Sequence, residues 1–216
     1  MRGIALLKGD TSIEAGKVTI HCNLRNIPII RLNKNEPLPE QYTPCGSIEW
    51  CLSLLEKKVV PDYYPEWLNA YLHRKVWYEV KWPLNTTCFI KPADTYKKFT
   101  GFVHEAGSYT KKKRNGTYWC SEVVKFINEW RYYVADGKVL CGKWYWGDEI
   151  NTPDAPGLAI EIPKGYCGAL DFGTLKDGKL VLVEAQHPFA CGWYGSGLDD
   201  IELYFKWLDS GWKYMK

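Results

Sequence analysis

Two acidic residues stand inside apolar segments in the last quarter of the chain. Asp171 lies in residues 170–173 and Glu184 lies in residues 183–186. A carboxylate in an apolar strand costs free energy unless it is paired or bound to a metal. If the two strands form a hairpin with both acids on one face, their oxygens suit Mg²⁺, which usually takes one or two carboxylates plus substrate phosphates. We therefore predict a metal site at Asp171 and Glu184.

Basic residues in the middle of the chain could hold an anion. Lys91 ends an apolar run, Phe89-Ile90-Lys91, and its ammonium could hold a phosphate as a point charge. By spacing alone, a solvated lysine at a strand end is the favoured interpretation. Lys98 lies just before Gly101, a pattern that suits a loop folding over phosphates. An ordinary hairpin turn with solvated lysines explains the same pattern.

A third segment combines an exposed strand with a charged pair. The backbone of Glu122, Val123 and Val124 could hydrogen-bond with the edge of an adenine. Glu129 and Arg131 are two positions apart, so they share a face if this segment is a strand. A simple cross-strand salt bridge accounts for this pair equally well.

Composition narrows the function classes. The formal net charge of +3 is too small to argue for nucleic acid or membrane binding by itself. No run of about 18 apolar residues is present, so we expect no membrane span. The run Lys111–Arg114 is interpreted as a solvated loop, with nucleic-acid contact as the lesser alternative.

The 8 cysteines form no C-x-x-C pair, and the 4 histidines show no ligand-type spacing. Several cysteines sit in apolar strand patterns, where a free thiol packs as a small core residue. We expect reduced, buried cysteines and a cytoplasmic protein, with an extracellular disulfide protein as the alternative.

These candidate residues need a framework of strands. Asp136-Gly137 and Asp177-Gly178 each lie between two predicted strands and are hairpin signals. The predicted strands are Val18–Cys22, Val76–Val80, Thr87–Lys91, Thr117–Lys125, Glu129–Ala135, Lys138–Trp144, Gly168–Thr174 and Lys179–Gln186. Helices are predicted over Ser47–Lys57, over Pro65–Arg74, and at the end of the chain through Ile201 and Leu208, where Gly211 can stop the helix. The pattern is α+β with a largely antiparallel sheet, and we place a boundary between residues 1–84, a short mixed segment, and residues 85–216, the strand-rich body.

Taken in order, these motifs resemble the ATP-grasp fold, in particular the short R2K-type ATP-grasp proteins found in bacteriophages and bacteria. The segments that carry the resemblance are Pro44–Trp50, Phe89–Asp94, Lys98–Val103, Ser121–Phe126, Glu129–Val134, Asp171–Gly173 and Leu182–Ala185. The resemblance implies two α+β lobes that hold ATP between them. It also implies an ATP- and Mg²⁺-dependent ligase that joins a carboxylate to an amine through an acylphosphate. The substrates would be small molecules or peptides, and a phage-encoded chain would act in the host cytoplasm.

The resemblance also implies roles for individual residues. Lys91 and Lys98 would hold phosphates, and the backbone of Glu122–Val124 would bind adenine. Glu129 belongs to the same nucleotide site, and Arg131 would stabilise the transferring phosphoryl group. Asp171 and Glu184 would hold Mg²⁺. Gln186 is the third metal candidate: the family usually has Asn at this position, and Gln keeps the amide oxygen but reaches one methylene further.

Two other function classes fit the same residues. One is a non-catalytic nucleotide- or nucleic-acid-binding module that uses Lys111–Arg114. Strong salt dependence of nucleic-acid binding would favour it. The other is a phosphotransferase that uses the same ATP site on a hydroxyl acceptor. The segment Trp193–Gly195 is a candidate wall of the acceptor site, from its position after Glu184.

Overall fold

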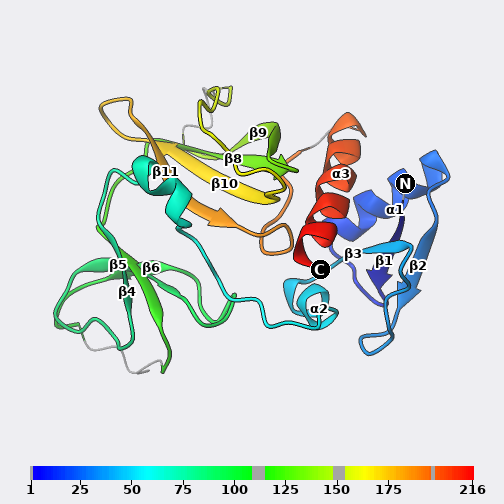
Figure 1. Cartoon of the computed structure of the whole chain (residues 1–216), viewed down its shortest axis with the longest axis horizontal. Helices are drawn as coiled ribbons and strands as arrows, with labels where there is room; N and C mark the ends of the chain where they lie inside the picture. The colour runs from blue at the N-terminus through cyan, green and yellow to red at the C-terminus, as the bar shows by residue number, and fades with distance from the viewer. Residues whose placement is uncertain (1, 109–114, 148–153, 196–197) are drawn as a thin grey trace.

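The computed structural model of the chain describes residues 2–108, 115–147, 154–195 and 198–216 (Figure 1). The predicted loop at Lys111–Arg114 therefore lies outside the described residues. The helices are α1 (Ile13–Arg25), α2 (Ile48–Ser53), the 3-10 helix η1 (Glu66–Tyr71) and α3 (Leu198–Met215). The strands are β1 (Gly3–Leu7), β2 (Ile29–Leu32), β3 (Tyr42–Cys45), β4 (Val76–Glu79), β5 (Cys88–Pro92), β6 (Phe102–His104), β7 (Tyr118–Ser121), β8 (Asn128–Ala135), β9 (Lys138–Trp146), β10 (Gly168–Thr174) and β11 (Leu180–Gln186).

The N-terminal unit is a three-stranded sheet in the order β2-β1-β3, and both of its strand pairs are parallel. The connection between β1 and β2 is α1, so the strand predicted at Val18–Cys22 is wrong. Ala15, Val18 and Cys22 are buried, at the spacing of one helix face, whereas Ile20 is 60% exposed. Ser12 caps the helix by accepting a hydrogen bond from the backbone of Ala15.

The small sheet has four strands in the order β4-β7-β5-β6, all antiparallel. Its two connections to the rest of the chain lie side by side. The Glu122 N–H donates to the Lys75 carbonyl (3.0 Å), and the Lys75 N–H donates to a Glu122 carboxylate oxygen (2.8 Å). β7 ends at Ser121, shorter than predicted, because the chain leaves the sheet there to cross to β8.

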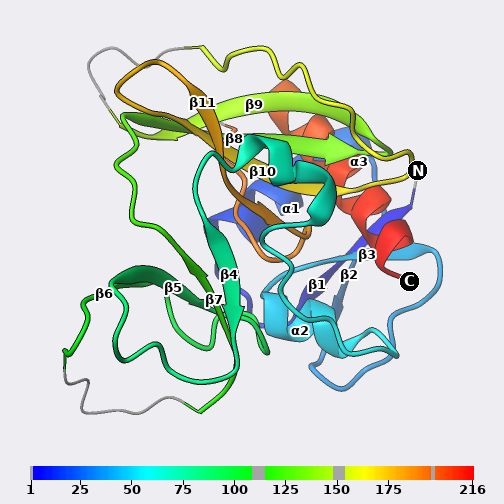
Figure 2. The same ribbon diagram turned by 60° about the vertical axis from the view of Figure 1, so that its left-hand side comes forward.

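The large sheet has four antiparallel strands in the order β11-β10-β8-β9. Both predicted hairpins are confirmed, since Asp136-Gly137 joins β8 to β9 and Asp177-Gly178 lies between β10 and β11. Asp136 and Gly137 have positive φ angles of 49° and 71°, which a tight turn of this kind requires. Figure 2 shows the small sheet at lower left and the large sheet above it. With its helices and mostly antiparallel strands, the fold is α+β as predicted.

α3 packs between the large sheet and the N-terminal unit, and its buried side chains join both in one core (Figure 1). The helix does not stop at Gly211, as predicted, but continues to Met215. A Cβ atom at Gly211 would lie only 2.4 Å from the Pro188 ring. The glycine therefore permits a close approach of the helix to Pro188, a tertiary reason that helix-end signals do not contain.

Two short elements connect the N-terminal unit to the sheets. α2 ends at Ser53, earlier than predicted, and the second predicted helix is the shorter η1, which begins after Pro65. η1 packs beside β11 (Figure 1).

The small sheet takes β4 from before residue 85 and its other strands from after it. The division into residues 1–84 and 85–216 stays a prediction.

Candidate functional site

A cavity of about 510 Å³ separates the small sheet from the large one. Its walls come from three directions: the small sheet, the large sheet, and the linker that joins β7 to β8. The predicted site residues among its lining are Lys91, Glu122, Val123, Val124, Glu129 and Glu184. The fold thus brings residues that are far apart in sequence to one cavity.

The linker wall has unpaired backbone and apolar side chains. Val123 and Val124 lie outside any strand, and Val123 is 48% exposed. Within the described part of the chain, no residue hydrogen-bonds with the backbone of Val123 or Val124. Phe89 and Phe126 add aromatic walls to the same cavity. This wall can accept a flat heterocycle that needs both apolar contact and backbone hydrogen bonds.

Lys91 projects from β5 toward the large sheet. Its ammonium forms an ion pair with Glu184 of β11 and lies 4.2 Å from the centre of the Tyr63 ring. The stem of Lys91 packs against Gly101, where an added Cβ would come within 2.9 Å of it. Burial lowers the pKa of Lys91 from 10.5 to about 7, against the raising effect of Asp171. An anionic ligand would restore the charged form.

Arg131 and Asp171 are direct register partners on β8 and β10. The guanidinium donates from Nε (2.8 Å) and Nη2 (2.7 Å) to the two carboxylate oxygens, and the residues are 6% and 1% exposed. Such a bidentate pair is specific in geometry. Nη1 has a longer hydrogen bond, 3.4 Å, to the Gly192 carbonyl. Neither residue lines the cavity; both lie behind its wall.

Glu129 and Arg131 share a face of β8, as predicted, but they do not pair with each other. The Tyr145 hydroxyl of β9 donates to Glu129. Burial raises the pKa of the Glu129 carboxyl, and the Tyr145 hydrogen bond opposes that shift. The Tyr145 hydroxyl also lies 3.5 Å from an Asp171 oxygen, so it connects the cavity wall to the Arg131–Asp171 pair.

Glu184 and Asp171 lie directly opposite each other on the β10–β11 hairpin, on one face as expected. The Gln186 amide nitrogen donates to Glu184. The described residues contain no cluster of three or more His, Cys, Asp and Glu side chains that could hold a metal. One or two carboxylates suffice for Mg²⁺ when phosphates supply other ligands. Glu184 with the Gln186 amide oxygen fits that need, whereas both Asp171 oxygens are engaged by Arg131.

Lys98 is the predicted residue that does not join the others. Its ammonium pairs with Asp94 at 2.7 Å and also donates to the Asn115 carbonyl, and it does not line the cavity. The pair lies on the connection between β5 and β6. In the segment Trp193–Gly195, Tyr194 lies against Arg131, whose guanidinium carbon is 5.1 Å from the ring centre, and the expected role of this segment at an acceptor site stays a prediction.

Sequence reasoning missed three residues of the site. Arg74 lines the cavity and donates to the Leu182 and Val183 carbonyls, which ties the entry of the small sheet to β11. Tyr63 lies under Lys91, and Tyr145 contacts Glu129. A lone arginine or tyrosine carries no spacing signal. Only Tyr145, on a strand opposite the Glu129–Arg131 face, could have been found by pairing the two strands through the Asp136-Gly137 turn.

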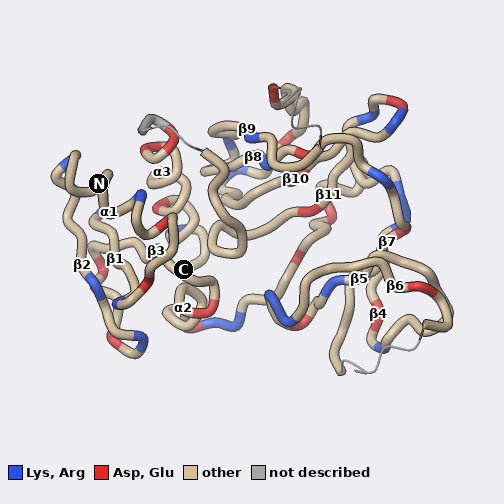
Figure 3. The backbone as a smooth tube through the Cα atoms, turned by 180° about the vertical axis from the view of Figure 1, so that it is seen from behind, with Lys and Arg blue, Asp and Glu red and all other residues tan. Residues whose placement is uncertain are grey.

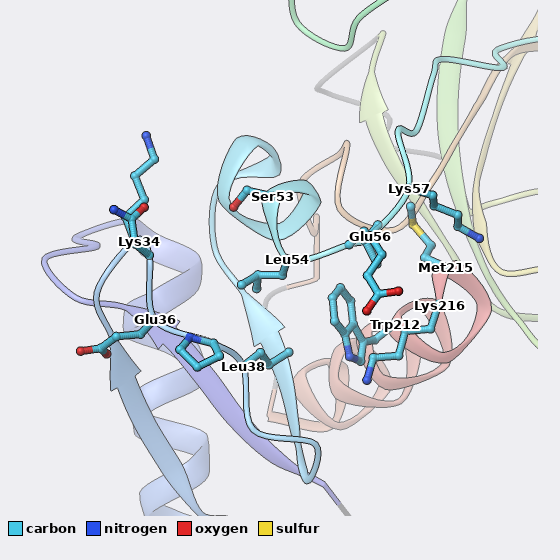
Figure 4. Close-up of a pocket in the computed structure, with 13 residues that line it drawn as sticks. Lys34, Glu36, Leu38, Ser53, Leu54, Glu56, Lys57, Trp212, Met215 and Lys216 are labelled. Atoms are coloured by element: carbon cyan, nitrogen blue, oxygen red, sulfur yellow. The ribbon is translucent and has the colours of Figure 1, made fainter.

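A larger cavity, about 1070 Å³, lies elsewhere, beside the N-terminal unit (Figure 4). It is an open groove between the segment from Lys34 to Leu38, the end of α2 and the end of α3. None of the predicted site residues lines it. The candidate site is therefore the smaller cavity, where six of the predicted site residues converge.

Lys and Arg are interspersed with Asp and Glu along the described backbone (Figure 3), in keeping with the net charge of +3. No helix among the described residues has the length and apolar character needed to cross a membrane. All eight cysteines are free thiols, and six of them are buried.

Comparison with known sequences gives one family match. Residues 71–203, more than half of the chain, match the family described as ATP-grasp domain, R2K clade family 2. The match covers every predicted site residue. No curated protein matches the chain.

Solved structures share the fold at low sequence identity. N5-carboxyaminoimidazole ribonucleotide synthetase from Thermotoga maritima is 12% identical, with a TM-score of 0.53 over 97% of this chain and 76% of that one. A RimK domain protein of the ATP-grasp type from Sphaerobacter thermophilus is 10% identical, with a TM-score of 0.51 over 99% of both chains. The macrocyclase MdnB from Microcystis aeruginosa is 9% identical, with a TM-score of 0.51 over 97% of this chain and 98% of that one. The α+β architecture is thus the ATP-grasp fold.

Proposed function

Because the chain belongs to family 2 of the R2K clade of ATP-grasp domains, we propose that it is an ATP-dependent ligase that joins a carboxylate to an amine with the help of Mg²⁺. One observation carries the proposal. The cavity between the two sheets is lined at once by the open backbone of the linker, by Lys91 and by Glu184. These are the three kinds of group that an adenine, a phosphate chain and a phosphate-bound cation require.

The adenine lies against Val123 and Val124, and its edge hydrogen-bonds with their backbone. The ribose and phosphates extend toward Lys91, whose ammonium moves from Glu184 to the phosphate oxygens. Phosphate contact favours the charged form of Lys91 and reverses the effect of burial on its pKa. Lys98 can join the phosphates only after it leaves Asp94.

The reaction proceeds in two displacements. A carboxylate oxygen of the first substrate attacks the γ-phosphorus of ATP, the bond to the bridging oxygen of ADP breaks, and an acylphosphate forms. The amine of the second substrate then attacks the acyl carbon, loses a proton, and displaces inorganic phosphate. Arg131 is fixed by Asp171 behind the cavity wall, and its positive charge favours the negative charge that develops on the phosphoryl oxygens without touching them.

The residues that would hold Mg²⁺ are Glu184 and Gln186, with Asp171 directly opposite. When bound, the ion would neutralise charge on the phosphate oxygens. Glu184 is freed for this role when Lys91 turns to the phosphates. The exchange of partners predicts that nucleotide and metal each strengthen the binding of the other.

Calorimetry with a non-hydrolysable ATP analogue, with and without Mg²⁺, tests the proposal. The wild type should bind the analogue more tightly with Mg²⁺, and Glu184→Ala should lose that increment. Glu56→Ala, which changes an exposed acid that does not line the cavity, should behave as the wild type. A wild type that binds no nucleotide in either condition would contradict the ligase proposal.

The two other function classes are separable with the same protein. A phosphotransferase would give a phosphorylated product, whereas a ligase gives an amide together with ADP and phosphate. A binding module would release no ADP with any acceptor. Its predicted contact segment, Lys111–Arg114, lies outside the described residues.

A further inference from the structure

A second cavity lies on the other side of the Glu184–Gln186 pair. It has a volume of about 580 Å³ and is lined by Gln186, whereas Glu184 lines the nucleotide cavity. The two side chains share a hydrogen bond. A molecule in the second cavity therefore faces the reaction centre across these two residues.

Trp67 and three tyrosines form part of the wall of the second cavity. Trp67 packs edge-on against Tyr166 with ring centres 5.1 Å apart, and Tyr166 packs edge-on against Tyr214 at 5.9 Å. Tyr96, from the connection after β5, lines the cavity as well. Aromatic faces attract cations as well as apolar groups.

Two exposed carboxylates, Asp62 and Glu66, line the cavity beside these rings, and Lys57 lines it as well. Tyr96, Tyr166 and Tyr214 line the same cavity as Asp62, and the Asp62 charge adds to burial in raising the pKa of their hydroxyls. Partial burial raises the pKa of Asp62 itself, against a hydrogen bond from the Tyr64 backbone. Within the described residues, no lysine or arginine forms an ion pair with it.

We propose that this cavity binds the amine substrate, and that this substrate carries a second, cationic nitrogen held by Asp62 and the surrounding rings. An unpaired acid with aromatic walls recognises an alkylammonium or guanidinium group. The reacting amine then points past Gln186 toward the acyl carbon. That the bound cation belongs to a substrate depends on the proposed ligase function. The cation site itself depends on the cavity alone.

The cavity also leaves room for an extended molecule. Lys57 and Met215 line both this cavity and the large groove shown in Figure 4. A diamine would lie within the cavity. A peptide with a basic side chain in the cavity could continue into the groove. The free diamine and the peptide both offer a cationic nitrogen to Asp62, and they differ in the rest of the molecule.

The test uses 1,5-diaminopentane as the probe, titrated into the full chain loaded with Mg²⁺ and a non-hydrolysable ATP analogue. The neutral 1,5-pentanediol has the same carbon chain and should bind at least about tenfold more weakly. Lysine methylamide, which keeps a free α-amine beside the cationic side chain, tests the peptide source, and tighter binding than the diamine would assign the cation to a peptide.

Asp62→Asn keeps the shape of the side chain and an acceptor for the Tyr64 backbone. It should weaken diaminopentane binding by at least about tenfold and leave binding of the ATP analogue unchanged. Tyr214→Leu should weaken diaminopentane binding by about twofold to fivefold. Glu56→Gln, an exposed acid that lines the groove but not the cavity, is the matched control.

Equal affinity of Asp62→Asn and the wild type for diaminopentane, or equal affinity of the diamine and the diol, overturns the inference. If the wild type binds Mg²⁺ and the ATP analogue but not the diamine, the inference fails and the ligase proposal stands. If the diamine binds through Asp62 while no nucleotide binds, the cation site stands and the ligase proposal fails.

Discussion

Two buried ion pairs lie close together in this molecule and differ in how they are held. Arg131 and Asp171 belong to one sheet, face each other in register and share two hydrogen bonds. Lys91 and Glu184 belong to different sheets and meet across a cavity that both line. The side chains of the first pair are 7% and 1% exposed, and those of the second 14% and 11%.

The difference separates a fixed pair from an exchangeable one. The fixed pair has its partners placed by strand register, so neither can leave without disrupting the sheet. In the exchangeable pair, burial lowers the pKa of Lys91, and strand register does not fix the two partners, which come from different sheets. We therefore expect a phosphate to be able to replace Glu184. The first pair serves mainly the fold, and the second serves the ligand.

The largest effect that would break this comparison is expected in the fixed pair. Asp171→Asn leaves the Arg131 charge buried without its partner and should lower the free energy of unfolding by about 3–5 kcal/mol. Urea denaturation measures this directly. The double variant Arg131→Met with Asp171→Leu should recover much of the loss, because no unpaired charge remains. A change below about 1 kcal/mol in Asp171→Asn would contradict a structural role.

The exchangeable pair should respond in binding rather than in stability. Lys91→Met removes the phosphate contact and should weaken binding of the ATP analogue by about 10- to 100-fold. The loss of stability in Lys91→Met should be smaller than that in Asp171→Asn, because Lys91→Met also removes a buried ammonium whose charged form is disfavoured by burial. Calorimetry measures the affinity of each variant for the ATP analogue, and urea denaturation measures its free energy of unfolding. Equal stability losses would remove the distinction.

The Lys91 pKa of about 7 predicts a pH dependence. Between that value and the ordinary 10.5, the unfolded state holds more protons at this site, so the Lys91 contribution to stability rises with pH. Phosphate binding has the opposite sign, because it needs the protonated lysine. Metal-free binding of the ATP analogue should weaken by roughly tenfold from about pH 7 to about pH 8.5, with proton uptake. Lys91→Met should flatten this profile; an unchanged profile would contradict the assignment to Lys91.

Tyr145 connects Glu129 on the cavity wall to the Arg131–Asp171 pair, and its removal should have the smallest effect. Tyr145→Phe deletes the hydrogen bond to Glu129 and should cost about 1 kcal/mol of stability. The ring contact with Tyr194 is retained, since the rings are stacked with centres 5.2 Å apart. Tyr78→Phe, at a half-exposed tyrosine outside the cavity, is the control. Differential scanning calorimetry on both variants measures the difference.

Local signals predicted the sheets better than the helices. The Asp136-Gly137 and Asp177-Gly178 turns fixed two hairpins, and the second of these brought Asp171 opposite Glu184. Val18, Ile20 and Cys22 alternate as in a strand, but Ile20 points to solvent on α1. Alternation over so short a segment does not distinguish a strand from one face of a helix.

The partners of the charged residues could not be predicted from sequence. The sequence places Lys91 at the end of a strand, but its pairing with Glu184 depends on how two sheets face each other. Lys98 shows the same limit, since its loop pattern gives no sign of the bond to Asp94. Residue type and spacing thus predicted which side chains take part in the site better than which of them pair.

The two hydrogen bonds between Lys75 and Glu122 have a consequence for how this fold can vary. They hold the entry and the exit of residues 76–121 side by side, so that segment has adjacent ends, the arrangement that favours insertion and exchange of a folded unit. Where this segment is attached, the two chain ends of the remaining protein lie next to each other, because Lys75 and Glu122 are hydrogen-bonded. The small sheet can therefore be replaced by a longer, shorter or differently charged version as a single cassette, with the large sheet left intact.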